Sequence, residues 1–137
     1  MNVENAVLPT SAQIAHLSQQ GEDQPICMVN LLKFKEKAEY ADGRVTDRTG
    51  REAYEIYGVE VVAHLAKVGA EIVFSSVVTG LVLGKVEDLW DSIAIAKYPS
   101  RKAMLTMMMD PDYRKSEEHR SAGLAGQLNI ETVPEVG

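Results

Sequence analysis

The adjacent residues His119 and Arg120 are the strongest candidates in this chain for a reactive site. An imidazole has an unperturbed pKa of about 6.5, so His119 can transfer a proton near neutral pH. The guanidinium of Arg120 can hold a carboxylate or an enolate. Neighbouring residues of a helix point about 100° apart, so we expect one of the two to face a pocket and the other to be structural.

Asn30 and two tyrosines form a second group of candidates. Asn30 interrupts an apolar stretch, and a buried amide without hydrogen bonds costs about 1 to 3 kcal/mol, so this side chain must have a partner. The partner is either a ligand or a neighbouring side chain or loop backbone. Tyr54 and Tyr57 share one helical stripe, where their hydroxyls suit a pocket between helix and sheet. The alternative is a pair of core tyrosines whose tips reach solvent.

Three further residues have side chains that are common in functional sites, but their spacing indicates a site less strongly. The indole of Trp90 is expected to pack over the mouth of a barrel or to anchor a dimer. Glu60 and His64 stand four residues apart and can share a helical face, but two ligands do not make a metal site. The chain has no signature of a phosphate loop, a serine elbow or a cysteine–histidine nucleophile. We therefore expect no metal and no cofactor.

Composition and charge limit the class of protein. The 137 residues are 45% hydrophobic and 25% charged, which is typical of one globular domain: a helical extension (1–24) and a core (26–133). A net charge of -6, with basic residues interspersed among acidic ones, disfavours nucleic acid and anionic membrane as partners. Cys27 stands alone, and no stretch approaches the length of a membrane span. We expect a cytoplasmic protein.

Strand and helix patterns alternate in the part of the chain that must position these candidates. The almost continuously apolar run Ile26–Phe34 predicts a central strand that is covered on both faces. A polar loop, Lys35–Gly50, leads to a helix over Arg51–Val68, whose apolar residues recur every three or four positions. The β-branched stretch Ala70–Leu83 predicts a long strand that bends, bulges or folds back as a hairpin.

The C-terminal half is predicted to contain two strands that flank a broken helix. The strands are Ser92–Tyr98 and Gln127–Val133, the second of them at an edge or a subunit contact. Ser100 can cap a helix over Arg101–Met109. After Asp110, a proline restarts a second helical piece, because proline is tolerated at the first helical position. That piece carries the adjacent histidine and arginine.

A short helix near the N-terminus is predicted as an addition to this core. Thr10 or Ser11 can cap it, and it runs through Gln20 to a stop at Gly21. The remaining βαββαβ order predicts an α+β, ferredoxin-like antiparallel sheet with both helices on one face. The other face would be bare and apolar, so we expect a symmetric homodimer that packs sheet against sheet.

Three stretches of the sequence resemble a known family. They are Met28–Phe34, then Gly50–Tyr54 with Tyr57, and finally Trp90–Ser100 followed by Asp110–Tyr113, His119 and Arg120. They are similar to the domain-of-unknown-function family numbered 1330, small proteins of ferredoxin-like fold that pair as dimeric α+β barrels. The resemblance implies that fold and a homodimer, but no particular activity.

In architecture alone, the chain resembles a wider superfamily that includes cofactor-free monooxygenases, muconolactone isomerases, haem proteins and plain ligand binders, among which the fold cannot choose. We expect a small-molecule pocket between the first core helix and the sheet, with His119 as catalytic base. The ligand-binding residues are expected to be Asn30, Tyr54, Tyr57, Arg120 and Trp90. An enzyme of this kind would perform cofactor-free proton-transfer or monooxygenase-like chemistry, with Asn30 or a tyrosine stabilising an oxyanion. A non-catalytic ligand binder or accessory protein, and a structural dimer with filled pockets, are the alternatives.

Overall fold

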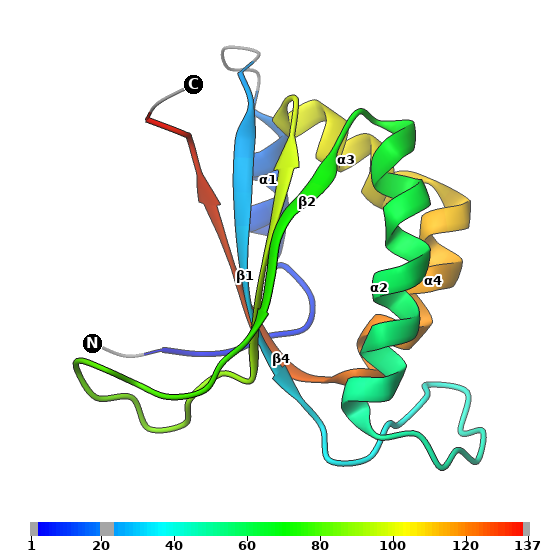
Figure 1. The fold of residues 1–137 in the computed structure, drawn as a ribbon. Coiled ribbons are helices and arrows are strands. Elements are labelled where there is room, and N and C mark those ends of the chain that lie inside the picture. Colours follow the sequence, from blue (N-terminus) through cyan, green and yellow to red (C-terminus); the bar gives the residue numbers. More distant parts are fainter. Residues whose placement is uncertain (1–2, 20–23, 136–137) are drawn as a thin grey trace.

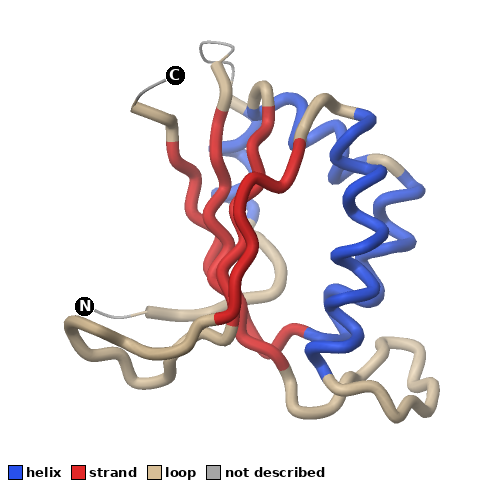
Figure 2. Tube along the Cα trace, in the orientation of Figure 1, coloured by secondary structure: helices blue, strands red, loops and turns tan. Residues whose placement is uncertain are grey.

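The protein has two main layers, a sheet and a set of helices on one side of it (Figures 1 and 2). The computed structural model describes residues 3–19 and 24–135. In chain order, the elements are α1 (Ser11–Ser18), β1 (Ile26–Phe34), α2 (Gly50–Lys67), β2 (Glu71–Val77), β3 (Ser92–Tyr98), α3 (Arg101–Met109), α4 (Pro111–Gly123) and β4 (Leu124–Thr132). The four strands are antiparallel to their neighbours in the order β2-β3-β1-β4. This topology confirms the predicted ferredoxin-like α+β fold.

Side chains of the sheet alternate between the helices and the opposite side. In the central strand β1, Ile26, Met28 and Leu32 are buried on the helix side. The opposite side, which we call the outer face, is largely apolar across its middle, where it carries Val29 and Leu31 of β1, Phe74 of β2, Ile93 and Ile95 of β3, and Leu128 and Ile130 of β4. Ser76 lies opposite Ile93, and Lys97 and Thr132 lie opposite Cys27 toward one end of this face. The described chain leaves this face partly exposed, as the 50% exposure of Phe74 shows. The prediction of a bare apolar face is confirmed.

The helices begin where a side chain can satisfy the first backbone N–H groups. Thr10 caps α1 and Thr49 caps α2, in both cases through a reciprocal capping box. Ser100 caps α3 as predicted, and Asp110 caps α4 ahead of the proline. Within the described residues, no helix combines the length and the apolar character that a bilayer crossing requires.

Two strands differ from their predicted bounds. β2 ends at Val77, and residues 78–91 form a loop instead of the strand or hairpin predicted up to Leu83. The predicted irregularity does occur, because the register with β3 shifts between Ile72 and Phe74. β4 begins at Leu124, three residues early, because α4 leads into it without a loop. The first helix ends at Ser18, where Gln19 is already extended, so it stops short of the predicted end at Gln20; Gln20 and Gly21 themselves lie outside the described residues.

Two glycines join the start of α2 to the end of α4. A Cβ on Gly50 would lie 2.1 Å from the carbonyl oxygen of Lys35 and 2.7 Å from that of Gly123. The backbone N–H of Lys35 donates to the Gly123 carbonyl (2.8 Å), and that of Gly50 donates to the Lys35 carbonyl (3.1 Å). This contact, which we call the glycine junction, holds both helices to the end of β1. It therefore sets how the helices lie over the sheet.

Candidate functional site

A cavity of about 1720 Å³ lies between the helices and the sheet. The turn Val68–Ala70 joins α2 to β2, and the two elements diverge from it (Figure 1). Lining residues that are also exposed mark the opening: Val59 and Val62 of α2 are 78% and 58% exposed, and Val77 of β2 is 63% exposed. The cavity therefore opens between α2 and β2.

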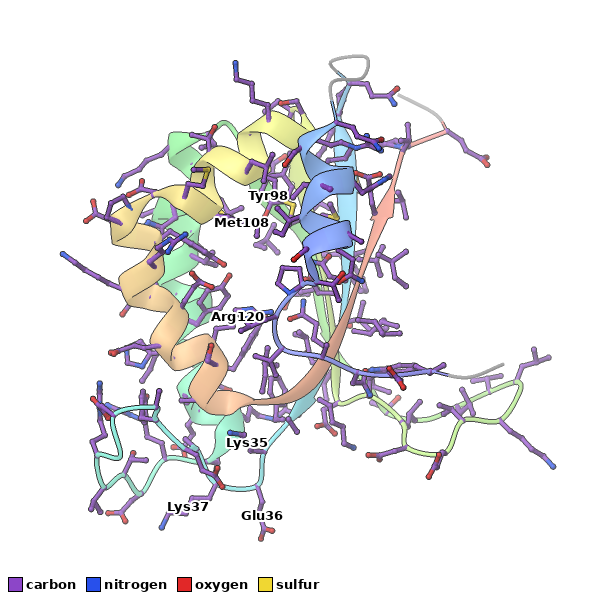
Figure 3. The ribbon with its side chains drawn as sticks, turned by 180° about the vertical axis from the view of Figure 1, so that it is seen from behind. Lys35, Glu36, Lys37, Tyr98, Met108 and Arg120 are labelled. Carbon is purple, nitrogen blue, oxygen red and sulfur yellow. The ribbon has the colours of Figure 1, made fainter. Side chains whose placement is uncertain are left out.

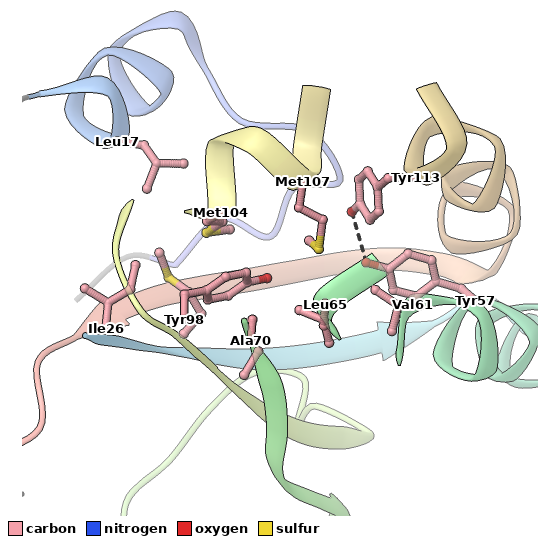
Figure 4. Close-up of a cluster of buried hydrophobic side chains, with 12 residues drawn as sticks. Leu17, Ile26, Tyr57, Val61, Leu65, Ala70, Tyr98, Met104, Met107 and Tyr113 are labelled. Carbon is pink, nitrogen blue, oxygen red and sulfur yellow. Dashed lines mark hydrogen bonds between the residues drawn. The ribbon is translucent and has the colours of Figure 1, made fainter. Parts of the chain in front are cut away.

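A cluster of buried hydrophobic side chains, shown in Figure 4, supplies the apolar and aromatic inner lining of the cavity. Leu65 of α2 and the methionines Met104 and Met107 of α3 are buried there and line the space. The hydroxyls of Tyr57 and Tyr113 lie 3.0 Å apart, so each tyrosine hydroxyl partners the other. α2 and α4 thus meet through a buried hydrogen bond at the cavity wall.

Four tyrosines at the cavity are neutral hydrogen-bonding groups at ordinary pH. Burial raises the pKa of Tyr54 to about 12 and also raises the pKa values of Tyr57, Tyr98 and Tyr113. Within residues 3–19 and 24–135, the hydroxyls of Tyr54 and Tyr98 have no hydrogen-bond partner. Among these residues, the fully buried side-chain atom without a partner is Nδ1 of His64, so the hydroxyls of Tyr54 and Tyr98 are not fully enclosed by protein. Because both tyrosines line the cavity, their hydroxyls open into it. Both can donate to a bound molecule.

A chain of hydrogen bonds crosses the cavity from the sheet to the N-terminal segment (residues 3–9). Gln127 donates from Nε2 to Oδ1 of Asn30 (2.6 Å), and Arg120 donates from Nη2 to Oε1 of Gln127 (2.6 Å). Nη1 of Arg120 donates to the backbone carbonyl of Val7 (2.9 Å). The amide of Asn30 also donates to backbone carbonyls of β1 and β3. We expected either a ligand or a protein group as the partner of Asn30, and in the structure its partners are protein groups.

One face of α4 supplies three chemically different groups to the cavity. Tyr113, Glu117 and Arg120 are spaced by four and three residues, which places them on the same side of a helix, and all three line the cavity. Arg120 extends from α4 toward the sheet (Figure 3), and its charge favours the ionised forms of Tyr54 and Tyr113. Burial raises the pKa of the Glu117 carboxyl, and Arg120 opposes that rise.

His119 lies on a different side of α4 from Arg120, as the helical geometry predicts. Its Nδ1 lies 2.7 Å from the hydroxyl of Tyr40, which also accepts from Nη1 of Arg48 (3.2 Å). These contacts tie α4 to the loop of residues 35–49. Contrary to expectation, His119 is not among the residues that line the cavity. A proton-transfer role for His119 stays a prediction.

Trp90, Glu60 and His64 also lie away from the cavity lining. Nε1 of Trp90 donates to Oδ1 of Asn5 (2.8 Å), which joins the loop of residues 78–91 to the N-terminal segment. Glu60 and His64 both contact Ser116, whose hydroxyl donates to the carboxylate (2.8 Å) and lies 2.9 Å from Nε2 of the histidine. In the described part of the chain, no three His, Cys, Asp or Glu side chains are grouped so that they could hold a metal ion.

The structure adds lining residues that the sequence analysis missed. Gln127, Tyr98 and Glu117 line the cavity together with Asn30, Tyr54, Tyr57 and Arg120. One signal was present in the sequence: alternate residues of β4 on the helix side, Gln127, Asn129 and Glu131, are all polar. A strand that packed into a dry core would carry apolar residues at these positions.

The topology and the cavity define the class, a ferredoxin-like α+β protein with a hollow between its helices and its sheet. A solved structure of a dimeric ferredoxin-like protein of unknown function from Thermobifida fusca has this fold, with a TM-score of 0.51 and 14% identity over 82% of this chain and 93% of that one. No family model matches the chain, and no curated protein does either.

A much stronger similarity identifies the family. The crystal structure of methylated RPA0582 protein is 32% identical, with a TM-score of 0.87, and the match covers 96% of each chain. Another structure of RPA0582, a protein of unknown function from Rhodopseudomonas palustris, is 29% identical, with a TM-score of 0.86 over 98% of this chain and 100% of that one. The chain belongs to the family of RPA0582.

Proposed function

We propose that this protein binds a small molecule in the cavity between its helices and its sheet. The hollow of about 1720 Å³ opens to solvent on one side and reaches the hydrophobic core on the other, which is the concave form that ligand sites take. The observation that carries the proposal is the lining: apolar side chains surround unpaired hydroxyls of Tyr54 and Tyr98 and the side chain of Arg120. Mostly apolar walls with a few polar groups are typical of ligand pockets.

We further propose that two copies pair through the outer face as a dimeric α+β barrel, in line with the resemblance to domain-of-unknown-function family 1330. An exposed apolar sheet surface on a soluble chain marks an interaction site. The loop of residues 78–91 adds Val82 and Leu83, which are 101% and 88% exposed. Lys33 holds that loop through Asp88 (2.9 Å) and Asp91 (3.5 Å). The Thermobifida fusca protein of this fold is described as dimeric.

Cofactor-free proton transfer is a second candidate function, and Glu117 is the observation that favours it. A carboxyl group whose pKa is raised by burial, and which faces a cavity, suits a general acid or base. The neighbouring guanidinium of Arg120 would stabilise an enolate formed from the substrate. The non-catalytic alternative uses the same cavity for binding alone.

The binding proposal is tested by thermal shift against a metabolite library, with and without a block in the cavity. A ligand that binds the native state alone at 100 times its Kd adds about 2.7 kcal/mol of stability, which raises Tm by several degrees. A Cβ on Gly58 would meet no atom within 4 Å, so Gly58→Phe should fill the cavity and abolish the shift. Ala63→Phe, on an exposed position of the same helix, should retain it. A library that stabilises neither the unblocked protein nor the Ala63→Phe variant would contradict the proposal.

The dimer is tested by sedimentation velocity at micromolar concentration. We expect the unmodified chain to sediment as a dimer and Ile95→Asp, in the centre of the outer face, to sediment as a monomer. Val45→Asp is the matched control, because Val45 is 97% exposed in a loop away from the sheet. A stable monomer of the unmodified chain would overturn the dimer while leaving the cavity in place.

A further inference from the structure

The walls of the cavity differ in polarity, and the difference limits what it can bind. On the helix side of β4, Asn129 lies opposite Asn30 in the register, next to Gln127. Asn129 lines the cavity and is exposed, so its amide is available to a bound molecule. The opposite wall is formed by aliphatic and methionine side chains: Val61, Leu65, Met104, Met107 and Met108. A ligand that satisfies both walls has a polar end and an apolar body.

Arg120 places a positive charge beside the polar wall. A guanidinium has five N–H donors, and the bonds to Val7 and Gln127 use two of them. Both partners are neutral, and within the described residues no carboxylate forms an ion pair with Arg120. Arg120 opposes the burial-driven rise in the pKa of the Glu117 carboxyl without forming an ion pair with it, so the partly buried guanidinium keeps free donors for an incoming anion.

The tyrosine next to Arg120 reinforces this preference. The hydroxyl of Tyr54 has no partner among the described residues and lies within the electrostatic influence of Arg120. A neutral phenol can donate a hydrogen bond to a carboxylate, and charge-assisted bonds of this kind are about twice as strong as neutral ones. Guanidinium and phenol together form a donor set for one anionic group.

From this arrangement we infer that the ligand is a small organic acid. Its carboxylate lies against Arg120 and Tyr54, and its acyl or aromatic body lies along the methionines of α3. The inference rests on the proposed binding function and names its ligand class. Glu117 provides a test of the charge of the ligand, because it lines the same cavity one helical turn from Arg120. A second negative charge at Glu117 weakens the binding of an acid but not that of a neutral analogue.

The test is isothermal titration at pH 7.5 with octanoate and phenylacetate, each compared with its neutral amide. We expect the acids to bind at least 10-fold more tightly than the amides. Arg120→Gln should lower acid affinity at least 10-fold and change amide affinity less than 3-fold. Glu117→Gln should raise acid affinity 3-fold or more and leave amide affinity unchanged. Arg51→Gln is the matched control, because Arg51 also lines the cavity but stacks on the ring of Phe34, 4.7 Å from its centroid.

The outcomes separate this inference from the binding function on which it rests. Acids and amides that bind equally well, with no gain from Glu117→Gln, would overturn the organic-acid inference and keep the binding function. If Arg120→Gln does not fold, the Glu117→Gln comparison decides alone. If neither probe binds while other library compounds do, the ligand class is wrong. If no compound binds at all, the proposed function fails as well.

Discussion

Gly50 and Gly58 lie on the same helix, eight residues apart, and their surroundings are opposite. A Cβ on Gly50 would collide with the backbone of β1's end and of α4, whereas a Cβ on Gly58 would meet nothing within 4 Å. At Gly50 the chain packs backbone against backbone, and at Gly58 the helix faces an open cavity. One helix therefore fixes the fold at its start and leaves room for a ligand further along.

The comparison indicates where sequence changes affect folding and where they affect binding. Close packing at the glycine junction lets α2 and α4 stand away from the sheet elsewhere without losing their positions. The cavity is thus a consequence of tight packing at one end of the helix layer.

Gly50→Ala should disrupt the close packing at the glycine junction. The added Cβ would lie 2.1 Å from a backbone oxygen, so α2 must move relative to β1. We expect a loss of about 3 kcal/mol or more in the free energy of unfolding, at or above the upper end of the usual overpacking range. Urea denaturation followed by circular dichroism measures it. A loss below about 0.5 kcal/mol would show that the junction is not tightly packed.

Alkaline pH should lower the stability of the protein through the ionisation of Tyr54 at the cavity. An unfolded tyrosine ionises near pH 10, whereas Tyr54 in the folded protein keeps its proton up to a pKa of about 12. The stability that this proton contributes is fully present below pH 10 and is lost as the pH rises toward 12. We expect a loss of about 2 kcal/mol from Tyr54 over this window. Tyr54→Phe should reduce the pH dependence of Tm, while Tyr57, Tyr98 and Tyr113 keep their contributions, and an unchanged slope would contradict the burial of the Tyr54 side chain.

Tyr57→Phe should weaken the cavity wall without changing its shape. The change leaves the Tyr113 hydroxyl without its partner at 3.0 Å, at a cost of about 1 to 2 kcal/mol. The double variant with Tyr113→Phe should lose less than the sum of the two single losses, because it leaves no unpaired hydroxyl. A double-mutant cycle in urea measures the coupling. Strict additivity would show that the two hydroxyls do not interact.

His119→Ala should separate the loop contact from the cavity. It removes one partner of Tyr40, which keeps its bond from Arg48, so we expect a loss of about 1 kcal/mol. Affinity for any cavity ligand should change less than 2-fold. If a substrate is found, loss of turnover in this variant with intact binding would support His119 as the base. In that case the loop of residues 35–49 would have to move for catalysis.

Gly58→Ala should produce the smallest effect, and in the opposite direction. Glycine within a helix is less favourable than alanine by about 1 kcal/mol, and the new methyl group has open space. We expect a gain of about 0.5 to 1 kcal/mol in the free energy of unfolding. Thermal melts of this variant and of Gly50→Ala, made side by side, compare directly the effect of one added methyl group at the two positions. A destabilised Gly58→Ala variant would mean that the cavity is closed at this point.

The sequence predicted the elements best where pattern and end signals agree. The bounds of β1 and α3 match the prediction, because an apolar run and a serine cap define them locally. β2 was predicted too long because its β-branched run continues to Leu83, whereas pairing stops where Val77 meets Ser92 at the start of β3. Pairing depends on where the partner strand begins, and the run itself carries no information about that.

The cavity depends on features that local patterns do not contain. The spacing of Tyr54 and Tyr57 identifies the inner stripe of α2, but not whether that stripe touches the sheet. The geometry of a helix predicted that His119 and Arg120 diverge. Which of the two faces inward depends on the rotation of α4, and the glycine junction sets that rotation.

The bond from Arg120 to the backbone of Val7 gives the N-terminal segment a role in the architecture of the cavity. Close contact between Asn5 and Gly126 and the pairing of Ala6 with Gln127 hold the same segment against β4. Removal of residues 1–9, by proteolysis or by truncation, would take away the acceptor of Nη1 of Arg120, leave Gln127 as its remaining partner, and uncover the side of the hollow that Val7 lines. Recombinant forms of this protein should therefore retain this segment.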